Sequence, residues 1–264
     1  MIGAKPCRRP DTMPTDLPDS DPSTLWRYSA FERVGGTAAD AGIAPSDGRS
    51  VLATTLVAEL RQLQQRHRDG DVLEVFAACL RQRENALLLL RHRGMLWPVT
   101  VFPDKRVYHV KRDLLPTLGE GNADLEIVGV EGASVRPPSA IADDSTEDPS
   151  HYRPLPALLW ALAVAAPHPF LLPEIAGRAA YRLTPDYRPE RAAAAGALGP
   201  ALRRLRTEIS ALRTIARWPG MDLERAMRLV NGVYLQGGLM VLRTHPAARD
   251  DVPQGSALGS WFRR

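Results

Sequence analysis

The sequence has little capacity for cross-linking or for metal binding through sulfur. It contains only two cysteines, Cys7 and Cys79, among 264 residues. No CxxC pair indicates a zinc or thioredoxin-like site, and a disulfide between these two is not expected. Cys79 lies in a helical apolar pattern and is interpreted as a small buried residue. Such cysteine usage is typical of a reduced, intracellular protein, so we expect a cytoplasmic location.

Long apolar runs are also missing. A helix that crosses a bilayer needs about 20 apolar residues, whereas the longest candidates, 86–90 and 155–166, are too short or interrupted by proline. Residues 1–23 mix prolines with charged residues and lack the apolar core of a secretory signal. We therefore expect no membrane contact and interpret residues 1–23 as a disordered tail.

Lysine is scarce, because only three of the 34 basic residues are lysines. An excess of arginine with much alanine and proline is typical of a GC-rich coding sequence, so the net charge of +4 says little about partners. The distribution of charge says more. Residues 198–264 hold eleven arginines against five acidic residues, and residues 131–150 hold five acidic residues against one arginine. A basic C-terminal surface and an acidic segment are predicted.

The hydrophobic pattern predicts an α+β N-terminal module over residues 24–131. Leu52, Leu56, Leu60 and Leu63 recur at helical spacing. Asp71 is a predicted N-cap. Helices are predicted at 24–34, 49–67 and 71–91, a β-hairpin at 95–110 and a further strand at 125–130. The helices at 49–67 and 71–91 are expected to form a helical hairpin beside a small antiparallel sheet.

Residues 132–154 are rich in proline and acidic residues and are interpreted as a linker, with high mobility expected over about 139–150. A mostly α-helical module is predicted over 155–246, followed by a tail at 247–264. Within it, helices are expected at 155–166, 170–180 and 201–217 and from an N-cap at Asp222, with a strand at 239–243.

Motifs for catalysis are missing from the sequence. It has no GxxxxGK[ST] phosphate loop, no GxSxG elbow and no HExxH metal motif. The six histidines are scattered, and Asp143 and Asp144 lie in the predicted linker, where no scaffold fixes their separation. We therefore assign no catalytic, cofactor-binding or metal-binding residue and favour a protein that is not an enzyme. An active site assembled from distant residues stays open as an alternative.

The pattern of residues 201–243 predicts a helix, a turn at 218–221, a second helix that ends at a Gly-Gly pair, and a strand. This order resembles the helix-turn-helix with a following wing in bacterial winged-helix modules. The resemblance implies DNA binding through side chains opposite the apolar residues Leu223, Met227 and Val230. The candidate residues for contact with nucleic acid or another partner are Arg225, Arg228, Asn231, Arg243 and His245, with the last two near a wing tip.

Three observations weigh against DNA binding. Asp222 and Glu224 at the helix start would repel phosphate, Gly232 weakens the helix, and any solvated helix face has a similar composition. We therefore favour a bacterial regulatory or adaptor protein that binds a partner protein or a ligand. A homo-oligomer formed through the face at 202–216 or through the edge of the small sheet stays open. A DNA-binding transcription regulator is the first alternative. A secreted effector with an unrecognised active site is the second.

Overall fold

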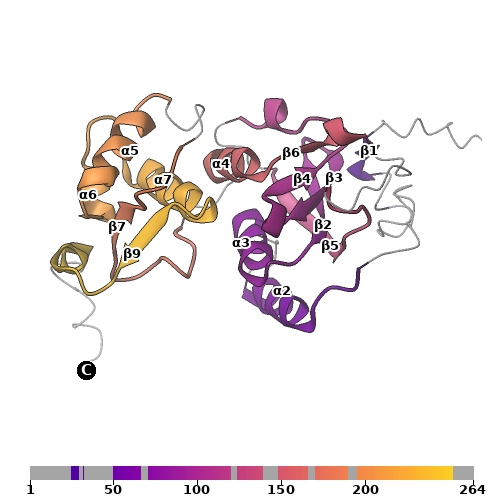
Figure 1. Ribbon diagram of the computed structural model, residues 1–264, viewed down its shortest axis with the longest axis horizontal. Helices are drawn as coiled ribbons and strands as arrows, with labels where there is room; N and C mark the ends of the chain where they lie inside the picture. Colours follow the sequence, from indigo (N-terminus) through magenta and orange to yellow (C-terminus); the bar gives the residue numbers. More distant parts are fainter. Residues whose placement is uncertain are drawn as a thin grey trace, which may run out of the picture.

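The computed structural model describes residues 25–29, 32, 50–66, 71–119, 124–138, 148–165, 170–189 and 195–251. Within these ranges helices are combined with two antiparallel sheets, which confirms the predicted α+β class. Figure 1 shows the two sheets on opposite sides of helix α4 (Leu155–Ala165), each with its own helices.

The larger sheet has the strand order β5-β2-β3-β4-β6, and a short strand β1 also pairs with β3. All of these pairs are antiparallel. Its strands are β1 (Trp26–Arg27), β2 (Ala86–His92), β3 (Met95–Phe102), β4 (Val107–His109), β5 (Glu126–Gly132) and β6 (Tyr152–Pro154). Short 3-10 turns occur at Pro103–Lys105, Leu115–Thr117 and Pro149–His151. The predicted hairpin at 95–110 is confirmed.

Helix α3 (Val72–Gln82) is shorter than predicted. Its start is confirmed, because Asp71 Oδ1 accepts hydrogen bonds from the backbone N–H groups of Leu73 (2.9 Å) and Glu74 (3.1 Å). The helix ends at Arg83, which adopts a left-handed conformation with φ of 53°. The prediction of helix up to residue 91 is wrong, because β2 begins at Ala86. Both faces of β2 are buried, so its leucines lack the alternation that usually marks a strand.

Two other N-terminal predictions differ from the structure. In the predicted helix at 24–34, residues 26–27 form β1, and among the remaining described residues 28, 29 and 32 are helical. The predicted linker ends in β6, which pairs with β4 and so belongs to the larger sheet. Most of the segment expected to be mobile lies outside the described residues, as do residues 1–23. The division into modules stays a prediction.

Helices α2 (Thr54–Arg66), α3 and α4 pack in succession beside the larger sheet. Helix α4 is apolar around its whole circumference, as expected for a helix covered on all sides. It contacts α3 and β4 on one side and α7 (Leu223–Leu235) on the other. The buried apolar residues of both halves of the chain consequently form one continuous core.

The smaller sheet has the order β8-β7-β9, with β7 (Ala180–Leu183) in the centre and β8 (Ser210–Ala211) and β9 (Leu239–Leu242) at its edges. Around it lie α5 (Leu198–Thr207), α6 (Leu212–Ala216), α7 and a 3-10 helix at Pro246–Asp251. The strand predicted at 239–243 and the N-cap at Asp222 are confirmed, since Asp222 Oδ1 accepts from the N–H of Arg225 at 2.7 Å.

Two predicted helices of this half are wrong. The single helix expected at 201–217 is divided into α5 and α6, because Ser210 and Ala211 leave the helical conformation to pair with β7. Residues 170–179 form turns instead of a helix. Side chains from other elements hold this segment in place. Tyr181 of β7 donates its hydroxyl proton to the carbonyl of Ile175 at 2.8 Å, and Asn231 of α7 hydrogen-bonds to the N–H of Leu172 and the carbonyl of Phe170.

Candidate functional site

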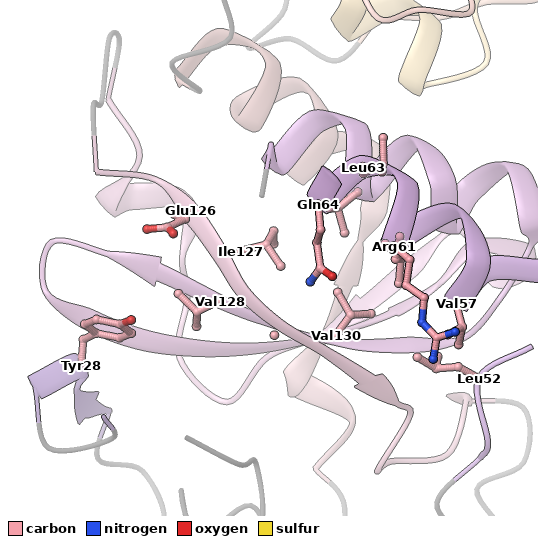
Figure 2. Close-up of a pocket in the computed structure, with 13 residues that line it drawn as sticks. Tyr28, Leu52, Val57, Arg61, Leu63, Gln64, Glu126, Ile127, Val128 and Val130 are labelled. Atoms are coloured by element: carbon pink, nitrogen blue, oxygen red, sulfur yellow. The ribbon is translucent and has the colours of Figure 1, made fainter. Parts of the chain in front are cut away.

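A groove lies between helix α2 and the edge strand β5 (Figure 2). Its volume is about 530 Å³. Eight aliphatic side chains line it: Leu52, Val57, Leu60, Leu63, Val75, Ile127, Val128 and Val130. Apart from the buried Val75 and Ile127 these side chains are half-buried, so they are within reach of a ligand. We call this feature the α2–β5 groove.

Strand β5 has an irregularity that shapes the groove. Leu90 pairs with Ile127 and Leu89 pairs with Gly129, so Val128 is an extra residue in the register. A bulge of this kind turns a side chain away from the regular alternation. Ile127 and Val128 accordingly both line the groove, although Ile127 belongs to the main core and Val128 packs against a second cluster formed by Leu87, Leu89 and Leu96.

One end of the groove is polar and internally neutralised. Arg91 pairs with Glu126, and its guanidinium lies 4.9 Å from the ring centre of Tyr28. Burial, together with a hydrogen bond to Glu32, raises the pKa of Tyr28. The phenol therefore stays protonated at neutral pH. The charged groups at this end are therefore paired with each other, and little net charge is left to attract a ligand.

The other end is open and carries a positive charge. Arg61 is exposed and forms no ion pair with any described residue. Figure 2 places Arg61 beside Val57 and Leu52, at the end opposite Tyr28 and Glu126. Val51, next to this end, is 91 % exposed. The groove therefore combines an aliphatic floor with one available guanidinium.

The edge of β5 adds a second binding element. In the described part of the chain β5 pairs as a strand only with β2, so no second described strand pairs with its other edge at Glu126–Val130. Ser50 covers just the end of the strand, where its N–H donates to the carbonyl of Ala133 at 3.3 Å and its hydroxyl accepts from the N–H of Ala133 at 3.0 Å. An open edge beside an apolar groove suits an added β-strand.

Of the residues that the winged-helix resemblance selected, Asn231 lies furthest from solvent. It is completely buried in α7. Its Oδ1 accepts from the N–H of Leu172 at 3.0 Å, and its Nδ2 donates to the carbonyl of Phe170 at 2.9 Å. Both ends of the amide hold the segment after α4, so Asn231 has no free polar atom for a base edge. Its predicted role in an interface is corrected to an internal one.

Arg228 and Arg225 differ in their exposure. The Arg228 side chain is 16 % exposed, pairs with Glu224 at 2.7 Å and donates to the carbonyl of Val164 in the last turn of α4. A cation at that position interacts favourably with the helix dipole. Arg225 is exposed, and its Nη1 donates to the carbonyl of Gly220 at 3.0 Å. Of the three candidates on this helix, only Arg225 has the exposure that a contact needs.

Arg243 and His245 follow β9. Arg243 is exposed, yet its guanidinium donates to the carbonyls of Glu174 (2.8 Å) and Ala176 (3.0 Å) and so braces the turn region. His245 is half-buried, and its Nδ1 accepts from the N–H of Ala247 at 3.2 Å. The five candidates therefore take part in several separate hydrogen-bond networks.

The groove residues were not identified from sequence. Leu52, Leu60 and Leu63 were assigned only to a helix face, and Val128 to a strand. The available signal was the aliphatic content of both segments, but their proximity depends on the sheet order.

His109 is buried in β4, with its ring centre 5.5 Å from that of His151 and 5.0 Å from that of Tyr152. This placement agrees with a structural histidine.

Cys79 is buried, as predicted, and burial raises the pKa of its thiol to about 12, so it is unreactive at neutral pH. The described residues hold no group of three or more His, Cys, Asp or Glu side chains that could bind a metal ion. Within the same ranges every helix is too short or too polar to span a bilayer.

No protein-family model, curated protein sequence or solved structure matches the chain.

Proposed function

We propose that this chain is a regulatory or adaptor protein without catalytic activity, and that it binds an extended segment of a partner protein in the α2–β5 groove. The observation that carries the proposal is the edge of β5 at Glu126–Val130, which pairs with no second strand among the described residues and lies beside an aliphatic groove. Backbone groups of the edge would provide affinity, and side-chain pockets would provide specificity. The residues that line the groove include no cysteine, serine or histidine that would act as a nucleophile or base.

The composition of the groove defines the partner. Aliphatic side chains at every second position of an added strand would meet Val57, Leu60 and Val130. A carboxylate at one end would meet Arg61, which has no ion pair in the described residues. The expected partner is therefore an extended, aliphatic segment with an acidic residue at one end.

The test uses a labelled peptide of alternating valine and threonine with an acidic residue at one end. Its binding to the full chain is measured by fluorescence anisotropy. Val57→Asp places a charge on the groove wall, and Ala58→Asp places the same charge at the adjacent exposed position of α2. We expect Val57→Asp to abolish binding and Ala58→Asp to leave it unchanged. Equal binding by both variants, or none by the unaltered chain, would refute the proposal.

A DNA-binding role is the second candidate, and the topology of the C-terminal half favours it. The order α5, β8, α6, α7 and β9 resembles that of a winged-helix module, with the difference that β7, which precedes α5, is the central strand of the sheet. In this proposal the exposed start of α7, including Arg225, would approach the major groove. Binding of a labelled duplex that falls steeply with salt and weakens in Arg225→Ala would support it. Unchanged binding in that variant would show that Arg225 at the start of α7 does not contact the DNA.

A further inference from the structure

Three guanidinium groups gather around the loop that follows β7. Arg188 Nη1 donates to the carbonyls of Pro185 (2.9 Å) and Tyr187 (3.2 Å). Arg206 of α5 donates through Nη2 to the same Tyr187 carbonyl at 3.1 Å. Arg182 of β7 donates through Nε to the carbonyl of Arg206 at 3.3 Å. Because Arg188 and Arg206 share one acceptor, their charged groups are close to each other.

None of these three arginines forms an ion pair with a described residue. Asp186, which precedes Tyr187, is exposed and has no such pair either. Elsewhere in the same half, arginines are neutralised by nearby carboxylates: Arg204 by Glu208 at 2.8 Å and Arg228 by Glu224 at 2.7 Å. The cluster therefore keeps a local excess of positive charge that carbonyl dipoles offset only in part.

The shared carbonyl is held in place by a tightly packed loop. The Tyr187 ring is buried, and its hydroxyl hydrogen-bonds to the Gln236 side chain. A Cβ on Gly238 would lie only 2.1 Å from the Tyr187 ring, so the glycine allows this close contact. The N–H of Thr184 also donates to the Gly238 carbonyl at 2.9 Å. The acceptor that orients Arg188 and Arg206 is thus positioned before any ligand arrives.

We propose that Arg188 and Arg206, supported by Arg182, bind phosphate groups of a nucleic-acid backbone. Guanidinium groups match phosphate oxygens through two parallel N–H donors. Arg188 and Arg206 are exposed, and Arg203 on α5 is a further exposed cation nearby in sequence. An open surface of this kind suits a polymer that presents phosphates at regular intervals. Contacts of this type position a protein on nucleic acid without reading its sequence.

This inference shares only the class of partner with the DNA-binding candidate, and it does not depend on the α2–β5 groove. It also does not require that α7 read bases. Failure of the peptide test or of Arg225→Ala would leave it unaffected. Unchanged binding by the cluster variants would leave both other proposals unaffected, whereas a chain that binds no duplex at low salt would also remove the DNA-binding candidate.

The test measures the affinity of the full chain for a labelled random-sequence duplex at several salt concentrations. The variants are Arg188→Gln, Arg206→Gln and the matched control Arg112→Gln, since Arg112 is exposed and lies outside the cluster. We expect each cluster variant to weaken binding and to reduce the slope of log affinity against log salt by about 1. The control should match the unaltered chain. Arg206→Lys should recover part of the lost affinity because it restores the charge.

Two results would overturn the proposal. One is that the unaltered chain fails to bind the duplex at low salt. The other is that the cluster variants retain the affinity and the salt slope of Arg112→Gln. Thermal unfolding of each variant shows that a loss of binding does not come from a loss of fold. A competing heparin fragment that binds as tightly as the duplex would also reject the assignment to nucleic-acid phosphates.

Discussion

Gly232 of α7 lies directly against the indole of Trp160 in α4. A Cβ at Gly232 would be 2.9 Å from Cε3 and 3.1 Å from Cζ3 of that ring, closer than side chains normally approach. Trp160 is itself buried in the common core, so it has little room to move away. Glycine costs about 1 kcal/mol relative to alanine inside a helix. Here that cost is offset by the close packing of α4 and α7.

Gly232→Val should therefore destabilise the protein by about 1–3 kcal/mol, because the added methyl groups overpack the contact with Trp160. Urea unfolding followed by tryptophan fluorescence measures this change. Gly119→Val is the control, since no atom lies within 4 Å of a Cβ at Gly119. Similar midpoints for the two variants would mean that α4 moves aside at little cost.

Asn231 provides a second test of the packing around α7. Asn231→Ala removes the partners of the Leu172 N–H and the Phe170 carbonyl. A buried polar group that loses its partner costs about 1–3 kcal/mol. We expect that loss in chemical denaturation, whereas Arg225→Ala, at an exposed position of the same helix, should change stability by less than about 0.5 kcal/mol. If Asn231→Ala were as stable as Arg225→Ala, the internal role of Asn231 would be wrong.

Local signals allowed some of these features to be predicted from the sequence. The N-caps Asp71 and Asp222 and the hairpin at 95–110 depend on neighbouring residues, and the structure confirms them. The leucines of β2 were misassigned because leucine favours helices and both strand faces are buried. The outward assignment of Asn231 failed because α4 and residues 170–172 cover more of α7 than the spacing of Leu223, Met227 and Val230 implied.

The candidate sites depended on contacts between distant segments. The α2–β5 groove requires that β5 lie at the edge of the sheet, and its bulge at Val128 has no signature in the sequence. The arginine cluster joins Arg188 to Arg206 through one carbonyl of Tyr187. The basic block predicted at 198–264 contains only Arg206 of this cluster, and the tertiary structure brings Arg182 and Arg188 to it.

The buried Tyr108 phenol should make the stability of the protein depend on pH in the alkaline range. Burial raises its pKa to about 12, from an ordinary value of 10.0, and its hydroxyl has no hydrogen-bond partner in the described residues. Between these two pH values the unfolded phenol ionises while the folded one stays protonated. The free energy of unfolding should therefore fall as pH rises from about 10 to 12, by up to about 2–3 kcal/mol from this group.

Tyr108→Phe should remove that part of the decline and leave stability at pH 7 unchanged or slightly higher, because no hydrogen bond is lost. The decline that begins near pH 9 from the Cys79 thiol should remain. Urea unfolding at several pH values measures both. Tyr152→Phe is a useful comparison, since the Tyr152 hydroxyl donates to the Arg136 carbonyl at 2.6 Å and its loss should cost about 1 kcal/mol at pH 7. An unchanged alkaline decline in Tyr108→Phe would contradict the assignment.

Arg81 of α3 connects the two halves of the chain by pairing with Glu59 of α2 and with Glu174 in the turn region after α4. The Arg81 and Glu174 side chains are only 35 % and 27 % exposed, so solvent screens their interaction less than that of a fully exposed pair. A double-mutant cycle with Arg81→Ala and Glu174→Ala should give a coupling energy of about 0.5–1 kcal/mol.

The control cycle uses Arg83→Ala and Asp104→Ala. That pair is 3.9 Å apart, with side chains 79 % and 64 % exposed, and should show almost no coupling. Raising the salt concentration to about 1 M should reduce the Arg81–Glu174 coupling, because the Debye length then shortens to about 3 Å. Coupling as small as that of the control would mean that the apolar contacts of α4 with α3 and α7 hold the two halves together without this ion pair.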